Sequence, residues 1–88
     1  MTRRRRKTTL GAALAALKTP AAVDRFLREM LTPREHHDLV LRWELLSLLA
    51  EGVPQRGIAD SLGVSLCKIT RGAKILKDKK SLVAKFLK

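Results

Sequence analysis

The chain has 88 residues, of which 19 are Lys or Arg and 8 are Asp or Glu, so its formal net charge is +11. This length limits the chain to one domain, and no apolar run reaches the ~20 residues that a membrane-spanning helix needs. The single cysteine, Cys67, excludes an intrachain disulfide and a cysteine-cluster metal site. The charge favours an acidic partner: nucleic acid, an anionic membrane surface or an acidic protein.

Five consecutive basic residues stand near the N-terminus, from Arg3 to Lys7. Like charges this dense repel one another, so we predict a disordered basic arm over residues 1–8. The arm is either a solvated tail or a segment that lies along a phosphate backbone. The Ala/Leu run that follows resembles a secretory signal, but it spans only about nine residues and ends at Lys18, so we expect a cytoplasmic protein.

Residues 9–88 are predicted to form a single helical domain. Two Thr-Pro pairs, at residues 19–20 and 32–33, combine an N-cap residue with proline at the first helical position. Glu35 completes a capping box in the second pair. Helices should therefore begin at the two prolines and near Leu10, and the lack of period-two alternation indicates an all-α fold.

The predicted third helix, over about residues 33–51, is apolar around most of its circumference. Its large side chains form two adjoining faces: Leu39, Trp43, Leu46 and Leu49, and then Leu41, Leu45 and Leu48. Such a helix is buried on most sides, and a monomer of this size has little material to cover it. We therefore expect an intertwined homodimer, with the central helix of a small monomeric bundle as the alternative. A last short helix should bury Leu82, Val83, Phe86 and Leu87 on one side.

The segment 54–77 has the pattern of a helix-turn-helix. Its shared core is predicted to be Ile58, Leu62, Val64 and Ile69, with small Ala59 at the helix crossing. Gly63 supplies the left-handed turn, and Ser65 is the N-cap of the second helix. In DNA-binding proteins the second helix of this motif enters the major groove.

Polar and basic side chains on this motif are the candidate DNA contacts. Leu66 and the Cys67 methylene can touch thymine methyl groups, and Thr70 can hydrogen-bond to a base edge. Basic residues recur at every third position of the second helix and form a basic stripe for phosphates: Lys68, Arg71, Lys74 and Lys77. The predicted DNA-binding set is Gln55, Arg56, Ser65, Leu66, Cys67, Lys68, Thr70, Lys74 and Lys77.

No pattern in the sequence predicts an enzyme or a metal site. His36 and His37 are adjacent, so on a helix they point about 100° apart and cannot chelate one metal well. No nucleophile or paired carboxylate is placed to work with them. We expect both histidines on the exposed surface of the helix.

The stretches "MLTP", "LLAEG", "QRGIADSLGVS" and "ITRG" together resemble the tryptophan repressor family. The resemblance covers roughly residues 22–88. It implies an all-α fold, a six-helix intertwined homodimer with a helix-turn-helix DNA-binding motif. It also implies L-tryptophan as a co-repressor that lies between the core and the helix-turn-helix. The ligand would orient the second helix of each helix-turn-helix in the dimer toward a double-stranded DNA operator.

The resemblance further implies which residues bind the ligand. They are Thr32, Arg42, Arg71 and Gly72, with Ile75 beside them and backbone carbonyls near Glu29 and Leu31 facing the amino group. A guanidinium can hold a carboxylate or stack on an indole ring. Two features depart from the family pattern: Ile75 replaces a small polar residue, and the linker at Val53-Pro54 is one residue short.

These observations predict a dimeric transcriptional repressor that binds operator DNA, with L-tryptophan as co-repressor and with no metal, membrane or catalytic role. The ligand would act by population shift, because it binds the DNA-fitting orientation better. Two alternatives stay open. One is a helix-turn-helix regulator of the same fold that does not use tryptophan, and the other is a basic RNA- or ribosome-associated structural protein.

Overall fold

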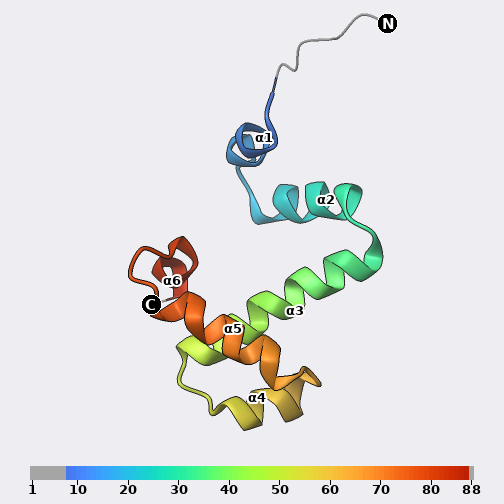
Figure 1. Ribbon diagram of the computed structural model, residues 1–88. Helices are drawn as coiled ribbons and strands as arrows, with labels where there is room; N and C mark the ends of the chain where they lie inside the picture. The colour runs from blue at the N-terminus through green and yellow to red at the C-terminus, as the bar shows by residue number, and fades with distance from the viewer. Residues whose placement is uncertain (1–7, 88) are drawn as a thin grey trace, which may run out of the picture. The chain divides into compact units, whose positions relative to one another are not determined.

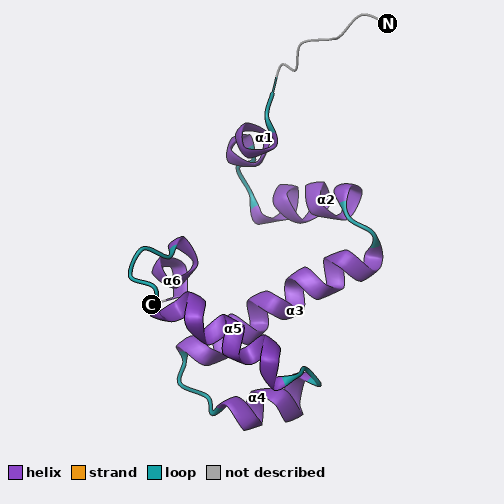
Figure 2. Ribbon diagram, viewed as in Figure 1, coloured by secondary structure: helices purple, strands orange, loops and turns teal. Residues whose placement is uncertain are grey.

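The computed structural model describes residues 8–87, and this part of the chain is built from α-helices joined by short loops, without a strand (Figure 1). Figure 2 shows the same division into helix and loop. The helices are α1 (Leu10–Ala16), α2 (Pro20–Met30), α3 (Pro33–Ala50), α4 (Gln55–Leu62), α5 (Leu66–Lys77) and α6 (Leu82–Leu87). The all-α prediction is confirmed. The predicted basic arm lies outside the described residues, apart from Thr8.

Helices α2 and α3 begin where their capping residues predict. The hydroxyl of Thr19 accepts a hydrogen bond from the Ala22 N–H at 3.0 Å, and Pro20 takes the first helical position. Thr32 and Glu35 form the reciprocal capping box: the Glu35 N–H donates to Thr32 Oγ1 at 3.1 Å, and the Thr32 N–H donates to Glu35 Oε1 at 2.8 Å. Local side-chain chemistry therefore fixes these helix starts.

The described chain divides between His36 and His37 into two compact units. In the first unit the carboxylate of Asp24 on α2 joins two elements: it accepts from Arg28 Nε at 2.7 Å and lies 3.0 Å from Nε2 of His36 on α3. The hydrogen bonds from Arg28 and then His36 hold the pKa of Asp24 below its usual range. His36 is buried, so the prediction of an exposed His36 was wrong; His37 is exposed. The pattern of apolar residues along α3 could not predict this burial, because it does not show that α2 packs against the side of α3 that carries His36.

The second unit carries the main core, where the C-terminal half of α3 meets α4 and α5 (Figure 1). Ile58 of α4 and Ile69 of α5 are completely buried, and Leu45 and Leu46 of α3 join them. Half-buried residues pack around this cluster: Leu48, Leu49, Val53, Ala59, Leu62, Val64, Ile75, Leu76, Val83 and Leu87. The four apolar residues predicted to form the core between α4 and α5 all belong to this core: Ile58 and Ile69 in the buried cluster, and Leu62 and Val64 packed against it.

The connection between α4 and α5 is a tight turn at Gly63. Its φ of 65° and ψ of 33° lie in the left-handed region, which costs a residue with a Cβ roughly 1–2 kcal/mol. Ser65 then caps α5, because its hydroxyl accepts from the Lys68 N–H at 3.4 Å. Pro54 occupies the N-cap position of α4 without a side-chain hydrogen bond.

Gly72 allows α5 to approach α3 closely. A Cβ at this position would lie 2.8 Å from Cδ2 of Leu45, 3.3 Å from Cδ2 of Leu46 and 3.2 Å from Cδ1 of Leu49. Real Cβ atoms essentially never approach a neighbour to 2.8 Å, so only glycine fits this crossing without rearrangement. Gly72 thus has a packing role in the fold, whatever it contacts in a ligand complex.

Helix α6 differs from its prediction. Ala84 is buried, and Val83 and Leu87 pack against the core, but Leu82 is 69% exposed and Phe86 is 81% exposed. The expectation that all four large apolar residues share a buried side was therefore wrong. Val83 and Leu87 stand one turn apart on one face, and Leu82 and Phe86 on its neighbour. Small Ala84 lets the first face approach α5 and leaves the second uncovered within the chain.

Candidate ligand cavity and nucleic-acid surface

A cavity of about 220 Å³ lies within the second unit, between α3 and α5. Helix α3 supplies half of its lining, and α5 with the preceding turn supplies the rest. The lining residues are Asp38, Leu41, Arg42, Leu45, Leu46, Val64, Lys68, Arg71, Gly72 and Ile75. The volume is at the small end for ligand pockets and suits a molecule of metabolite size.

The chemistry of this lining is divided between charge and apolar surface. Three cationic side chains, Arg42, Lys68 and Arg71, face one carboxylate, Asp38. Leucines of α3 and the side chains of Val64 and Ile75 form the apolar part. Such a cavity can hold a molecule that combines an anionic group with an apolar body.

Four of the five residues predicted to surround the ligand line this cavity: Arg42, Arg71, Gly72 and Ile75. Thr32 is not among the lining residues; it belongs to the first unit, where it caps α3. The sequence reasoning missed Asp38 and placed Lys68 only among the DNA contacts. The spacing in the sequence could have indicated both residues. Asp38 stands four residues before Arg42 and Lys68 three residues before Arg71, so each lies on the same helix face as a predicted ligand-binding arginine.

The side of α5 away from its buried residues forms a second candidate surface. Leu66 is 53% exposed, and Cys67 and Thr70 are also exposed. The Thr70 hydroxyl donates to the Leu66 carbonyl at 2.9 Å. Because its single hydrogen is used within the helix, the hydroxyl oxygen can only accept from a partner outside it.

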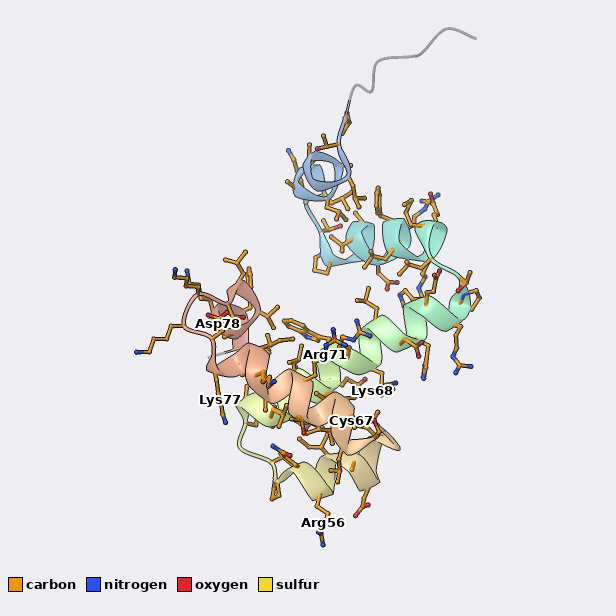
Figure 3. All side chains as sticks on the ribbon, viewed as in Figure 1. Arg56, Cys67, Lys68, Arg71, Lys77 and Asp78 are labelled. Atoms are coloured by element: carbon orange, nitrogen blue, oxygen red, sulfur yellow. The ribbon has the colours of Figure 1, made fainter. Side chains whose placement is uncertain are left out.

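The predicted phosphate contacts are all exposed but do not share one direction. In Figure 3 the labelled Lys68 and Arg71 lie beside α3, where both line the cavity, whereas Arg56 and Lys77 extend away from it. Gln55 and Lys74 are exposed and lie outside the cavity lining. The lysine stripe on α5 is therefore divided between the cavity and the outer surface.

A third surface is apolar and uncovered within the second unit. On α3, Leu39 is 40% exposed, Val40 42% and Trp43 46%. These values are high for large apolar side chains on the longest helix, and the exposed Leu82 and Phe86 of α6 add to the uncovered apolar area. Among residues 8–87, no group of His, Cys, Asp and Glu could hold a metal ion, and no helix is long and apolar enough to cross a membrane.

The helices and the cavity together describe a small all-helical protein, in which a cation-lined cavity lies beside a pair of helices with exposed basic residues. The chain belongs to the Trp repressor protein family, whose family model matches residues 7–88. This confirms the resemblance inferred from the sequence. The family is a regulatory, non-enzymatic family of transcriptional repressors.

Two relatives illustrate the similarity. The chain is 40% identical over 73 residues to a Trp operon repressor homolog of Chlamydia caviae, which covers 82% of this chain and 72% of that protein. It is 43% identical over 53 residues to a Trp operon repressor homolog of Actinobacillus succinogenes, which covers 59% of this chain and about half, 52%, of that relative. No solved structure matches the chain.

Proposed function

We propose that this protein is a dimeric repressor that binds a specific DNA operator through α4 and α5, and whose DNA affinity is controlled by a small ligand in the cavity. One observation carries the proposal. Helix α5 buries Ile69 completely while it exposes Leu66 and Thr70, in a chain that belongs to a repressor family. A helix held in this way by its partner helix can offer its first turns to the major groove.

Base contacts and phosphate contacts are assigned to different residues. Leu66 and Cys67 can contact thymine methyl groups, and Thr70 can accept a hydrogen bond from the amino group of adenine or cytosine. The exposed Gln55, Arg56, Lys74 and Lys77 supply phosphate contacts, which give affinity without choosing a sequence. Ser65 serves the cap of α5 and contributes indirectly by fixing where the helix begins.

A second copy of the chain is the proposed cover for the apolar surface of α3 and α6. Leu39, Val40 and Trp43 leave much of their area in solvent within one chain. A chain of 88 residues that buried this area against a partner would gain roughly 25 cal/mol for each Å² removed from water. Two subunits would then present two copies of α5 to two half-sites.

L-tryptophan is the ligand that membership of the family suggests. Arg42 and Arg71 can hold its carboxylate and stack on its indole ring. A ligand that binds the DNA-fitting arrangement better than others shifts the population toward it, by no more than that difference in affinity. The second candidate is a repressor of the same fold that uses another ligand. Ile75 in the cavity lining favours this candidate, because an alkyl side chain cannot accept a hydrogen bond from the amino group of tryptophan.

The proposal is tested by selecting bound DNA from a random pool, with and without L-tryptophan. We expect enrichment of a sequence with two related half-sites. Thr70→Ala should relax the preference at one position in each half-site. Ser47→Ala is the matched control, because Ser47 makes the same type of hydroxyl-to-carbonyl bond, to Trp43, on α3. An RNA-binding structural protein would enrich no DNA sequence and would respond equally to both substitutions.

A further inference from the structure

We propose that the turn between α5 and α6 is a second contact to the DNA backbone, in which Lys79 and Lys80 bind phosphates beyond those that α5 reaches. The proposal rests on the proposed function in taking duplex DNA as the partner of α5. It extends the DNA-binding surface past the helix-turn-helix of residues 54–77, into a segment that the motif does not include.

The positive charge of the second unit is concentrated in its C-terminal part. Residues 66–87 carry seven Lys or Arg and one Asp, a net charge of +6 (seven minus one). Residues 37–65 carry two Arg and four Asp or Glu, a net charge of −2 (two minus four). Within α4 the charges of Arg56 and Asp60 cancel. The attraction of this unit for an acidic polymer therefore comes from α5 and the residues that follow it.

The lysines of this region are exposed and are not neutralised by the chain itself. Within residues 8–87 none of the five that follow the first turns of α5 makes an ion pair: Lys74, Lys77, Lys79, Lys80 and Lys85. Lys74 and Lys77 stand in the last turn of α5, where a cation interacts favourably with the helix dipole. Lys79 and Lys80 lie beyond the end of the helix, so the dipole does not account for them.

Hydrogen bonds fix the backbone that carries Lys79 and Lys80. The Lys80 N–H donates to Oδ1 of Asp78 at 2.9 Å, and the Ser81 N–H donates to the Asp78 carbonyl at 3.1 Å, which makes a β-turn with aspartate at its first position (Figure 3). Ser81 then caps α6, because its Oγ accepts from the Ala84 N–H at 3.1 Å. An ordered backbone lowers the entropy that these lysines lose when they bind a phosphate.

The exposed face of α5 leads from the proposed base contacts to this turn. Leu66, Thr70 and Lys74 are spaced four residues apart, and Lys77 follows Thr70 by seven, so all four lie on one face. Along the helix axis Lys77 is roughly 10 Å from Thr70. The major groove is about 12 Å wide. A helix that places Thr70 at the base edges therefore brings its C-terminal end, and the turn after it, to the phosphates at the groove wall.

The size of the expected effect follows from counterion release. Each phosphate that a lysine neutralises steepens the salt dependence of binding by about 0.9 in the slope of log affinity against log salt. Loss of both contacts should therefore lower this slope by about 1.8 for each subunit bound. Phosphate contacts choose no base, so the preferred DNA sequence should stay the same.

The experiment measures fluorescence anisotropy of a labelled random-sequence DNA duplex with the full chain over a range of salt concentrations. We expect the double variant Lys79→Gln/Lys80→Gln to lower the slope by about 1.8 for each subunit bound. The matched control is Lys18→Gln/Lys85→Gln, which removes the same charge from exposed positions outside the turn and should leave the slope unchanged. Circular dichroism melts would show that each variant is folded.

A second pair of variants tests whether the ordered turn positions the lysines. Asp78→Asn and Asp78→Ala remove the same negative charge, but only asparagine keeps an oxygen that accepts from the Lys80 N–H. We expect Asp78→Ala to bind the duplex about two- to tenfold more weakly than Asp78→Asn, which corresponds to the loss of one hydrogen bond. An effect of charge alone would make the two variants equal.

The proposal is overturned if the double variant keeps the wild-type slope, if the control pair lowers the slope as much, or if the two Asp78 variants bind equally. Single-stranded RNA and vesicles that contain phosphatidylglycerol test other anionic partners. A double variant that loses binding to either of them while it keeps its slope on duplex DNA would overturn the proposal in favour of that partner.

Selection of bound DNA from a random pool separates this proposal from the proposed function. If the wild-type chain enriches no sequence but the double variant still lowers the slope, the turn remains a DNA contact and the repressor function fails. If both proteins enrich the same sequence and have equal slopes, the repressor function stands and the contact at the turn fails.

Discussion

Replacing Gly72 by alanine tests whether the close crossing of α3 and α5 determines both stability and the shape of the cavity. The added Cβ would lie 2.8 Å from a methyl group of Leu45 and within 3.3 Å of methyl groups of Leu46 and Leu49. Leu45 is 3% exposed and Leu46 is 5% exposed, so their methyl groups can give way only within the core or into the cavity that both residues line. Overpacking of this kind costs about 1–3 kcal/mol.

The substitution also brings a gain that must be subtracted. Alanine is favoured over glycine inside a helix by about 0.8–1 kcal/mol. The balance is a loss of about 1 kcal/mol in the free energy of unfolding, with an upper limit of roughly 2 kcal/mol. For a domain of this size, 1 kcal/mol lowers Tm by about 4–8 °C. Because either α5 moves away from α3 or the leucine methyl groups move into the cavity, the variant should also bind cavity ligands more weakly.

Gly57→Ala is the matched control. Gly57 lies in α4, where an added Cβ would meet only Cγ1 of Val53, at the ordinary contact distance of 3.8 Å. Only the helix-propensity gain applies, so this variant should be more stable by about 0.5–1 kcal/mol. Urea denaturation followed by circular dichroism, at one fixed protein concentration, gives both free energies. If Gly72→Ala stabilises the protein as Gly57→Ala does, the packing argument is refuted.

Four further predictions concern single side chains. Ile69→Ala should lower the free energy of unfolding by about 2–5 kcal/mol in urea denaturation, since Ile69 is fully buried; a change below about 1 kcal/mol would contradict its place in the core. Asp24→Asn should destabilise the protein at neutral pH. The difference in urea midpoint should shrink as the pH falls below 3.8 and vanish below the lowered pKa of the folded state, because the carboxylate stabilises the fold only while it is ionised. A difference that persisted in acid would exclude this cause. Trp43→Asp should shift sedimentation equilibrium from dimer toward monomer, and an unchanged mass would argue against an interface on α3. Lys77→Ala should lower the slope of log affinity for operator DNA against log salt by about 0.9, whereas an unaltered slope would remove Lys77 from the phosphate contacts.

Local sequence patterns were enough to predict the helices and where they begin. Capping residues act through hydrogen bonds to backbone groups only three residues away, so Thr19, Thr32 and Ser65 could be assigned without the fold. The left-handed turn at Gly63 is equally local. The apolar spacing also placed Ile58 and Ile69 in the core, because the short turn between α4 and α5 leaves few ways to bury both.

Which neighbour each helix face contacts became clear from the folded arrangement of the helices. His36 is buried because Asp24 of α2 pairs with it, and Phe86 is exposed because Ala84 and its neighbours take the place against the core. Lys68 lines the cavity because Gly72 brings α5 close to α3. Such contacts join residues distant in the chain, and the spacing along one helix does not record which of its faces another helix will cover.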